Sequence, residues 1–255
     1  MKEIAAALIF FTRIPFYKLK CFNVDPKYFK EAINYWSIAG WVTGGISVAT
    51  LYLADHLFSY EIAIVLTLLM RVLITGALHE DGLADFVDGL GGGTTKKRVL
   101  EIMKDSHIGT YGVLSLIFYF MLRYFLLINL SFHTALVTLF VADTFCKMLC
   151  SHMTFFLPYA RDAETSKAKL VYVPMSIKAV ILAGLAGLLP LFVTAFFFPC
   201  ILIAIISSII VFGIVIALLN KRIQGYTGDC CGAIFLLCEL AFFMAINGIA
   251  YLSPF

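Results

Sequence analysis

The sequence predicts an all-α integral membrane protein, a polytopic bundle of about seven transmembrane helices. Of its 255 residues, 62% are hydrophobic and 14% are charged, whereas soluble domains carry roughly 45–50% apolar and about 25% charged residues. The apolar residues form continuous runs of helix length, unlike the alternating segments of about ten residues that build a membrane β-barrel. Lys and Arg collect in alternate loops between these runs, as the positive-inside rule requires. A water-soluble fold is therefore excluded.

Seven apolar runs are long enough to cross the bilayer, because a span needs about 20 mostly apolar residues. The predicted spans lie at residues 34–54, 61–80, 112–132, 134–157, 178–198, 199–219 and 231–252. Only residues 131–133 and 199–200 interrupt two of the apolar stretches, so those two hairpins must be tight. The apolar run at 4–11 is too short to span and predicts an interfacial or re-entrant helix.

The distribution of positive charge predicts the orientation of the bundle. Sixteen of the 19 Lys and Arg residues lie before the first span or after the second, fourth and sixth spans, and the other three lie inside spans. The N-terminus is therefore expected in the cytoplasm and the C-terminus outside. Residues 1–255 are expected to form one multi-pass domain of the cell (inner or plasma) membrane, with a cytoplasmic or interfacial segment at 1–33. The net charge of +3 does not indicate a nucleic-acid partner.

A cluster of acidic residues follows at the predicted cytoplasmic end of the second span. Asp81, Asp85 and Asp88 are spaced i, i+4 and i+7, so on a helix all three project from one narrow face. Like charges so arranged repel one another, and a hard divalent cation relieves the repulsion. The spacing predicts a Mg²⁺ site for a phosphate-bearing substrate; the alternative is a set of solvated charges at a helix end. His79 and Glu80 point away from this face, and we expect no direct role for them on an unbroken helix.

Residues 81–111 as a whole are expected to form a cytoplasmic, acidic and glycine-rich active-site loop. Its run Gly91–Gly93 would let backbone N–H groups approach a phosphate closely. It is not a Walker A motif, because the spacing before Lys96 is wrong. A phosphate cradle and a plain flexible turn are equally compatible with the glycines.

Two further polar segments lie on the same predicted side. Lys104 could neutralise phosphate charge and Asp105 could complete a metal shell, the alternatives being an interfacial lysine and a helix N-cap. Asp229 opens the seventh span as a metal or substrate contact, or as an ordinary cap. Within the spans, charged side chains are costly and are candidates for function. These are Arg71, Arg123, Asp143, Lys147 and Glu239, of which Asp143 and Lys147 are spaced to pair with each other.

Taken in order, the motifs resemble the cobalamin synthase family, the adenosylcobinamide-GDP ribazoletransferases. The matching segments are Phe11 to Pro15, His79 to Gly89, Glu101 to Ser106, Ile108 to Gly112, Tyr159 to Arg161 and Gly225 to Ala233. The resemblance implies a membrane enzyme of late cobamide assembly that joins adenosylcobinamide-GDP to α-ribazole or α-ribazole 5′-phosphate, releasing GMP, with Mg²⁺. The chain departs from the family at His107, often Arg there, at residues 162–165, at Gln224 and at Leu236.

The resemblance and the local chemistry together give the expected site. The expected catalytic residues are Asp81, Asp85, Asp88 and Asp105, of which the first three are expected to hold the metal. The expected substrate contacts are Arg13, Lys104, His107, Arg161, Thr227 and Asp229. The expected reaction is in-line attack of a ribose hydroxyl on the cobinamide-side phosphorus, with an aspartate as general base.

Two other functions compete with this interpretation. A CDP-alcohol phosphotransferase fits poorly, because Ala84-Asp85 stands where that family has Ala-Arg. A secondary transporter of a corrinoid or another anionic substrate should carry its acids near the bilayer midplane and show paired repeats. The expected partners are the two substrates and the lipid bilayer; a homo-oligomer or a complex with other cobamide-assembly enzymes is also compatible with the sequence.

Overall fold

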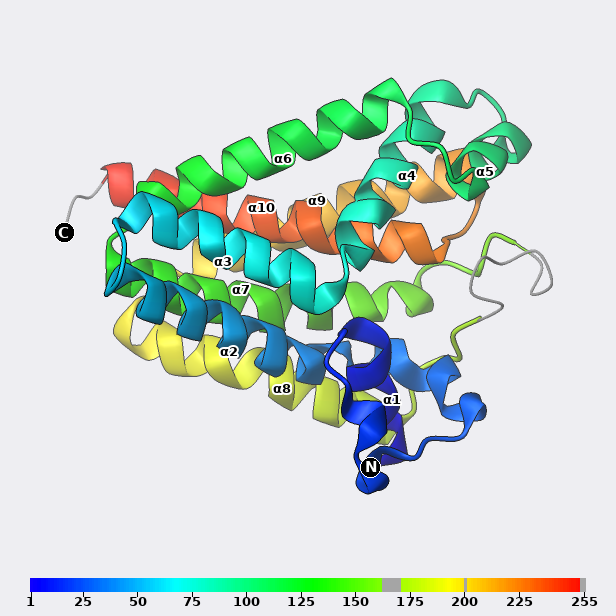
Figure 1. The fold of residues 1–255 in the computed structure, drawn as a ribbon. Coiled ribbons are helices and arrows are strands. Elements are labelled where there is room, and N and C mark those ends of the chain that lie inside the picture. Colours follow the sequence, from blue (N-terminus) through cyan, green and yellow to red (C-terminus); the bar gives the residue numbers. More distant parts are fainter. Residues whose placement is uncertain (162–170, 200, 253–255) are drawn as a thin grey trace.

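The computed structural model is all-helical across the residues it describes, which are 1–161, 171–199 and 201–252. Long α-helices run side by side as a bundle, and shorter helices lie toward one of its ends (Figure 1). The long helices are α2 (Trp36–Asp55), α3 (Tyr60–Thr75), α6 (Thr110–Ile128), α7 (Phe132–Ser151), α8 (Ile177–Phe197), α9 (Ile201–Ile223) and α10 (Gly228–Leu252). The short α-helices are α1 (Lys2–Phe11), α4 (Leu78–Gly92) and α5 (Lys96–Lys104). The 3-10 helices are Phe16–Lys18, Lys20–Phe22, Pro26–Tyr35 and His152–Phe155.

The prediction of a polytopic membrane bundle is confirmed. Among the described residues, six helices are long and apolar enough to cross a membrane, and a bent pair of helices raises the number to seven. Six predicted spans correspond to α2, α6, α7, α8, α9 and α10, with ends that differ by a few residues. The tight turn between α6 and α7 is present, whereas the second predicted hairpin includes Cys200, which lies outside the described residues.

The second predicted span, 61–80, is wrong as a single straight helix. α3 ends at Thr75, and α4 leaves it at an angle of 87°. Gly76 and Ala77 between the two helices have φ angles of 65° and 56°, and residues in this left-handed region end an α-helix. α3 has 16 residues, which corresponds to about 24 Å at 1.5 Å per residue. The bend places α4 and its acidic residues toward one end of the bundle (Figure 1).

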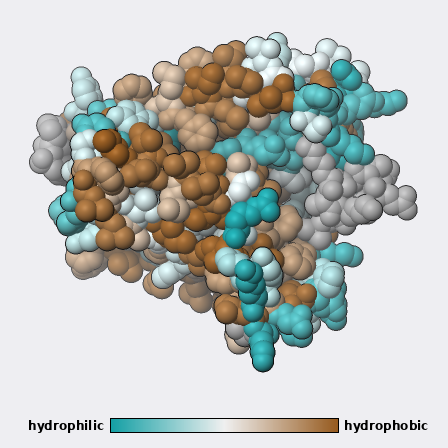
Figure 2. All heavy atoms as spheres, in the orientation of Figure 1, coloured by the Kyte–Doolittle hydropathy of each residue, from teal (hydrophilic) through white to brown (hydrophobic). Residues whose placement is uncertain are grey.

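Small residues on α2 allow the close packing at the centre of the bundle. A Cβ atom at Gly40 would lie 3.1 Å from the Cα atom of Thr144 on α7, and one at Gly44 would lie 3.3 Å from the Cβ atom of Asp143. Small residues at helix contacts are typical of membrane bundles, where van der Waals packing holds the helices together. α6, α8 and α9 present large apolar side chains outward, as expected for surfaces in contact with lipid. Figure 2 shows the apolar surface of one face in brown, over α3 and α6, with hydrophilic residues gathered around α5 and the N-terminal segment.

Two buried ionic clusters lie between the long helices. The carboxylate of Glu239 accepts hydrogen bonds from Nη1 of Arg71 at 2.6 Å and from Nη2 of Arg123 at 2.9 Å. Asp143 and Lys147 form the ion pair that their spacing predicts, and Nζ of Lys147 also donates to Thr43 Oγ1. Each of these charged side chains therefore contacts an opposite charge, with the single carboxylate of Glu239 shared by two arginines, and such pairing is usual for ionic side chains at membrane depth.

Candidate active site

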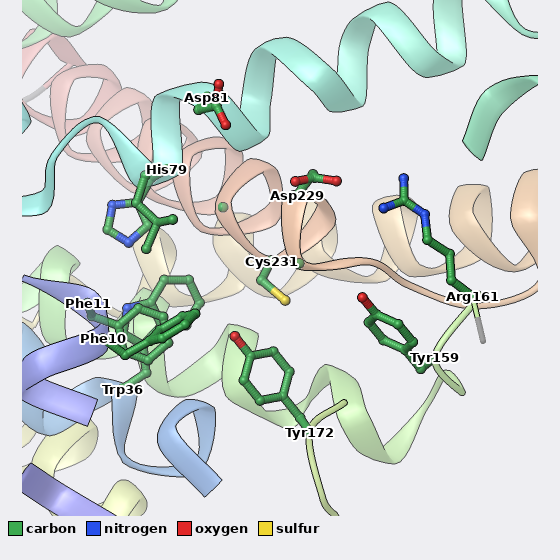
Figure 3. Close-up of a pocket in the computed structure, with 13 residues that line it drawn as sticks. Phe10, Phe11, Trp36, His79, Asp81, Tyr159, Arg161, Tyr172, Asp229 and Cys231 are labelled. Atoms are coloured by element: carbon green, nitrogen blue, oxygen red, sulfur yellow. The ribbon is translucent and has the colours of Figure 1, made fainter. Parts of the chain in front are cut away.

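A cavity of about 170 Å³ lies where α1, α2, α4, the α7–α8 connection and the start of α10 meet. Pockets that enclose a drug-sized ligand usually measure about 300–1,000 Å³, so this cavity encloses only part of a large substrate. Figure 3 shows its wall. The lining residues are Phe10, Phe11, Trp36, Leu78, His79, Asp81, Tyr159, Arg161, Tyr172, Gly228, Asp229, Cys231 and Gly232.

Two glycines bring α4 and α10 into backbone contact beside this cavity. A Cβ atom at Gly82 would lie 2.8 Å from the carbonyl oxygen of Asp229, and one at Gly232 would lie 3.0 Å from the Cα and carbonyl oxygen atoms of His79. Only glycine allows this approach without moving a backbone. The contact places the carboxylates of Asp81 and Asp229 on the same side of the cavity (Figure 3).

Arg161 reaches the same wall through a short backbone bridge. The N–H group of Ala160 donates to the carbonyl oxygen of Tyr226 at 2.8 Å, and the N–H group of Tyr226 donates to Pro158 at 2.9 Å. This bridge holds the segment before Arg161 against the segment that begins α10. Nη2 of Arg161 donates to the carbonyl oxygen of Leu100 at 3.0 Å, which ties the guanidinium to α5.

The cavity has two chemically different ends. Asp81, Asp229 and Arg161 bring charge to one end, and the hydroxyl of Thr227 donates to Oδ2 of Asp229 at 3.3 Å. The side chain of Asp81 is exposed and has no hydrogen bond or ion pair with any residue that the structure describes. Its carboxylate is therefore available to a ligand. The other end is lined by aromatic rings and His79.

Asp88 does not fit the expected role of metal ligand. Its two carboxylate oxygens accept hydrogen bonds from the backbone N–H groups of Gly109 at 2.7 Å and Gly112 at 2.8 Å. These N–H groups belong to the beginning of α6, so Asp88 caps a neighbouring helix from α4. Asp85 is 9% exposed and lies one turn after Asp81 on the same helix. The three aspartates share a helix, as expected, but they do not share one environment.

A Mg²⁺ site fits part of the expected ligand set. Within the described residues, no group of three or more His, Cys, Asp and Glu side chains could hold a metal ion. Mg²⁺ is commonly held by one or two carboxylates together with phosphate oxygens of a substrate. Asp81 and Asp229, which line one cavity, fit that pattern, whereas Asp88 lies outside the lining and both of its oxygens accept backbone hydrogen bonds.

The segment 81–111 is not the loop expected from its glycines. α4 continues through Gly92, and α5 follows after a short turn. The N–H group of Gly93 donates to the carbonyl oxygen of Gly89 at 2.9 Å, and Nη2 of Arg222 caps the carbonyl oxygens of Leu90 and Gly93 at 3.0 and 2.5 Å. The glycines therefore end a helix, and this geometry does not form the phosphate cradle that was one alternative.

Five other expected site residues lie outside the cavity lining: Arg13, Lys104, Asp105, His107 and Thr227. Thr227 is buried beside Asp229. Lys104 and Asp105 are exposed at the end of α5, where Oδ1 of Asp105 accepts from the backbone N–H of His107 at 3.0 Å and lies 2.7 Å from its Nδ1. These hydrogen bonds lower the pKa of Asp105, which makes it a weaker base. Arg13 lies at the α3–α4 bend, where its N–H donates to Ile74 at 2.6 Å.

The structure adds residues that the sequence pattern left out. His79 is 1% exposed, lines the cavity and stacks on Trp36 with ring centroids 5.3 Å apart. Helical periodicity placed His79 opposite the aspartates, but the cavity extends around the first turn of α4. Tyr172 comes from the α7–α8 connection, and no motif marks it. The pattern His79-x-Asp81 was the one signal that could have identified the histidine.

The fold and the cavity define a class: a polytopic membrane protein with a carboxylate-bearing cavity at one end of a helical bundle. A family model described as cobalamin-5-phosphate synthase matches residues 3–247. The chain therefore belongs to the cobalamin-5-phosphate synthase family.

Curated relatives agree over almost the whole chain. The adenosylcobinamide-GDP ribazoletransferase of Vibrio cholerae serotype O1 is 37% identical over 245 residues, which cover 94% of this chain and 91% of the relative. Proteins of the same name from Shewanella sp. (strain W3-18-1) and Vibrio parahaemolyticus are 33% and 35% identical over 254 residues. These alignments cover 96% of this chain and 94% and 92% of the relatives. No solved structure matches the chain.

Proposed function

We propose that the chain transfers the cobinamide phosphate group of adenosylcobinamide-GDP to α-ribazole or α-ribazole 5′-phosphate, releasing GMP. The observation that carries the proposal is the cavity that Asp81, Asp229 and Arg161 line together, in a chain that belongs to the cobalamin-5-phosphate synthase family along nearly its full length. Substrates that carry a pyrophosphate need both a cation and charged side chains at the reacting phosphorus. The cavity offers carboxylates that can hold the cation and a guanidinium that can contact the phosphates.

The reaction is an in-line displacement at the phosphorus on the cobinamide side of the pyrophosphate. The ribose hydroxyl of the acceptor forms the new O–P bond, the bond from phosphorus to GMP breaks, and a carboxylate of the cavity accepts the hydroxyl proton. Arg161 is placed to balance the negative charge of the phosphates. When Mg²⁺ is bound, it supplies further neutralisation of the pyrophosphate; Asp81 and Asp229 are the residues that would hold it.

We also propose that the cavity faces the cytoplasm of a cell-membrane protein. The basic residues of α5 lie at the same end of the bundle as α4 (Figure 1), and Lys and Arg accumulate on the cytoplasmic side of membrane proteins. α10 runs from the cavity toward the opposite end of the bundle, which supports an external C-terminus. Nucleotide substrates are then available directly from the cytoplasm.

The transporter alternative has less support. A transporter should hold its ionisable side chains free along a path near the midplane. In this chain Glu239 and Asp143 inside the bundle are engaged in ion pairs with arginine and lysine. The cavity carboxylates Asp81 and Asp229 instead lie at the first turns of α4 and α10, beside the end of the bundle.

The test of the proposed function is GMP release by detergent-purified protein that is given adenosylcobinamide-GDP and α-ribazole. We expect GMP to appear together with a new corrinoid product, and only when Mg²⁺ is present, because the pyrophosphate needs a cation to neutralise its charge. EDTA, which removes the cation, should abolish GMP release. Excess Mg²⁺ should restore release after EDTA. Protein that is folded and binds the corrinoid but releases no GMP would contradict the proposed function, and corrinoid uptake by proteoliposomes would then support transport.

Asp88→Asn separates helix capping from metal binding. An amide has one acceptor oxygen in place of two, so one of the N–H groups at the start of α6 loses its partner. We expect the free energy of unfolding to fall by about 1 kcal/mol, with an unchanged Mg²⁺ concentration for half-maximal GMP release. Thermal unfolding in detergent and a Mg²⁺ titration measure the two quantities. A higher Mg²⁺ requirement with unchanged stability would show that Asp88 is a metal ligand after all.

A further inference from the structure

The aromatic end of the cavity has no role in the phosphate chemistry proposed above. The rings of Phe11 and Trp36 are stacked, with centroids 4.7 Å apart and an interplanar angle of 16°. The ring of His79 also stacks on Trp36, with centroids 5.3 Å apart and an interplanar angle of 23°. Phe10 and Tyr172 complete this end of the wall, with their ring centroids 6.5 Å apart. A rigid set of flat rings favours a flat aromatic ligand.

Two polar groups at this end are suited to a ligand with few hydrogen-bonding atoms. Neither ring nitrogen of His79 has a hydrogen-bond partner among the described residues, although the side chain is almost fully buried. The hydroxyl of Tyr172 points toward Cys231, between the aromatic rings and Asp229 (Figure 3). Burial raises the pKa of Tyr172, so its hydroxyl keeps its proton and remains a donor.

We propose that this aromatic end binds the flat base of the α-ribazole acceptor, with the Tyr172 hydroxyl donating a hydrogen bond to the free ring nitrogen of the base. The proposal rests on the proposed function, because it places the acceptor ribose toward Asp229 and Asp81, where the phosphate chemistry takes place. A dimethyl-substituted benzimidazole is flat and apolar and has a single free ring nitrogen, which matches the aromatic wall and the one hydroxyl.

The other rings of the two substrates fit this end less well. Guanine presents several donors and acceptors along its edges, more than the Tyr172 hydroxyl and the His79 ring can pair with, and each unpaired group would lose its hydrogen bonds to water. A corrin ring does not enter a cavity of about 170 Å³. The base of the acceptor is therefore the substrate ring that the lining selects.

Isothermal titration calorimetry of the full chain in detergent tests the proposal without turnover. The probes are α-ribazole, an analogue in which a C–H group replaces the free ring nitrogen, and GMP. We expect the wild-type protein to bind α-ribazole about tenfold more tightly than the analogue. The Tyr172→Phe variant should bind α-ribazole and the analogue with equal affinity, because the substitution removes the hydroxyl donor and keeps the aromatic ring. GMP should bind with the same affinity to both proteins.

Tyr17→Phe is the matched control, since Tyr17 is 65% exposed and lies outside the cavity lining. Phe10→Leu adds a second variant that removes part of the wall, and it should weaken both ribosides and leave GMP unchanged. Equal loss of both ribosides in Tyr172→Phe, or competition between GMP and α-ribazole for one site, would overturn the proposal. GMP release measured on the same samples reports separately whether the proposed reaction occurs.

Discussion

Asp81→Asn should lower the rate of GMP release by about 10²–10³-fold, the loss typical when one preorganised electrostatic group is removed from an active site. The asparagine keeps the size of the side chain but removes its charge, so it binds Mg²⁺ poorly and cannot accept the hydroxyl proton. Folding should be unaffected, because Asp81 is exposed and has no partner among the described residues. Steady-state kinetics at saturating substrates, with thermal unfolding as the check on folding, measures both effects.

The matched control for Asp81 is Asp55→Asn. Asp55 ends α2, at the opposite end of that helix from Trp36, which lines the cavity. The same chemical change there should leave turnover within about twofold of wild type, because a surface substitution away from special features costs little. A folded Asp81→Asn protein with near-normal turnover would show that Asp81 takes no part in the reaction.

The fold could be predicted from the sequence because the length of the apolar runs and the positions of the positive charges can both be read directly from the chain. A span needs about 20 apolar residues wherever it lies, and that requirement located α2 and α6 to α10 within a few residues. The bend at Gly76 and Ala77 could not be predicted in this way. The residues from 61 to 80 stay predominantly apolar, so hydropathy gives no sign of a break. The helix is broken by the left-handed φ angles of two successive residues, and hydropathy carries no information on backbone angles.

The site was only partly predictable, for a related reason. Helical spacing gives the direction in which Asp81, Asp85 and Asp88 leave α4, but not what lies in that direction. The N-terminus of α6 lies next to Asp88, whereas Asp81 lines the same cavity as the start of α10. His79 reaches the cavity because α4 packs against other helices, and Tyr172 reaches it from the α7–α8 connection. The periodicity of a single helix predicts neither position.

Glu239→Gln should lower the free energy of unfolding by about 3–5 kcal/mol, the cost of leaving a buried charge without its partner. Glu239 is 0% exposed and accepts from both Arg71 and Arg123, whose own exposures are 4% and 0%. The glutamine leaves two guanidinium charges with no compensating carboxylate inside the bundle. Unfolding in detergent, together with the yield of monodisperse protein, measures the loss.

A triple replacement shows whether these charges serve stability alone. Arg71→Met, Arg123→Met and Glu239→Leu together remove all three charges, and apolar residues of similar volume often replace a buried ionic cluster at no cost in stability. The two methionines should also keep contact with the rings now facing the guanidiniums, Phe235 and Phe243. We expect the triple variant to recover most of the stability that Glu239→Gln loses, and to release GMP, because none of the three residues lines the cavity. A stable triple variant without activity would instead show that the buried triad contributes to the reaction, and that the catalytic machinery extends from the cavity into the bundle.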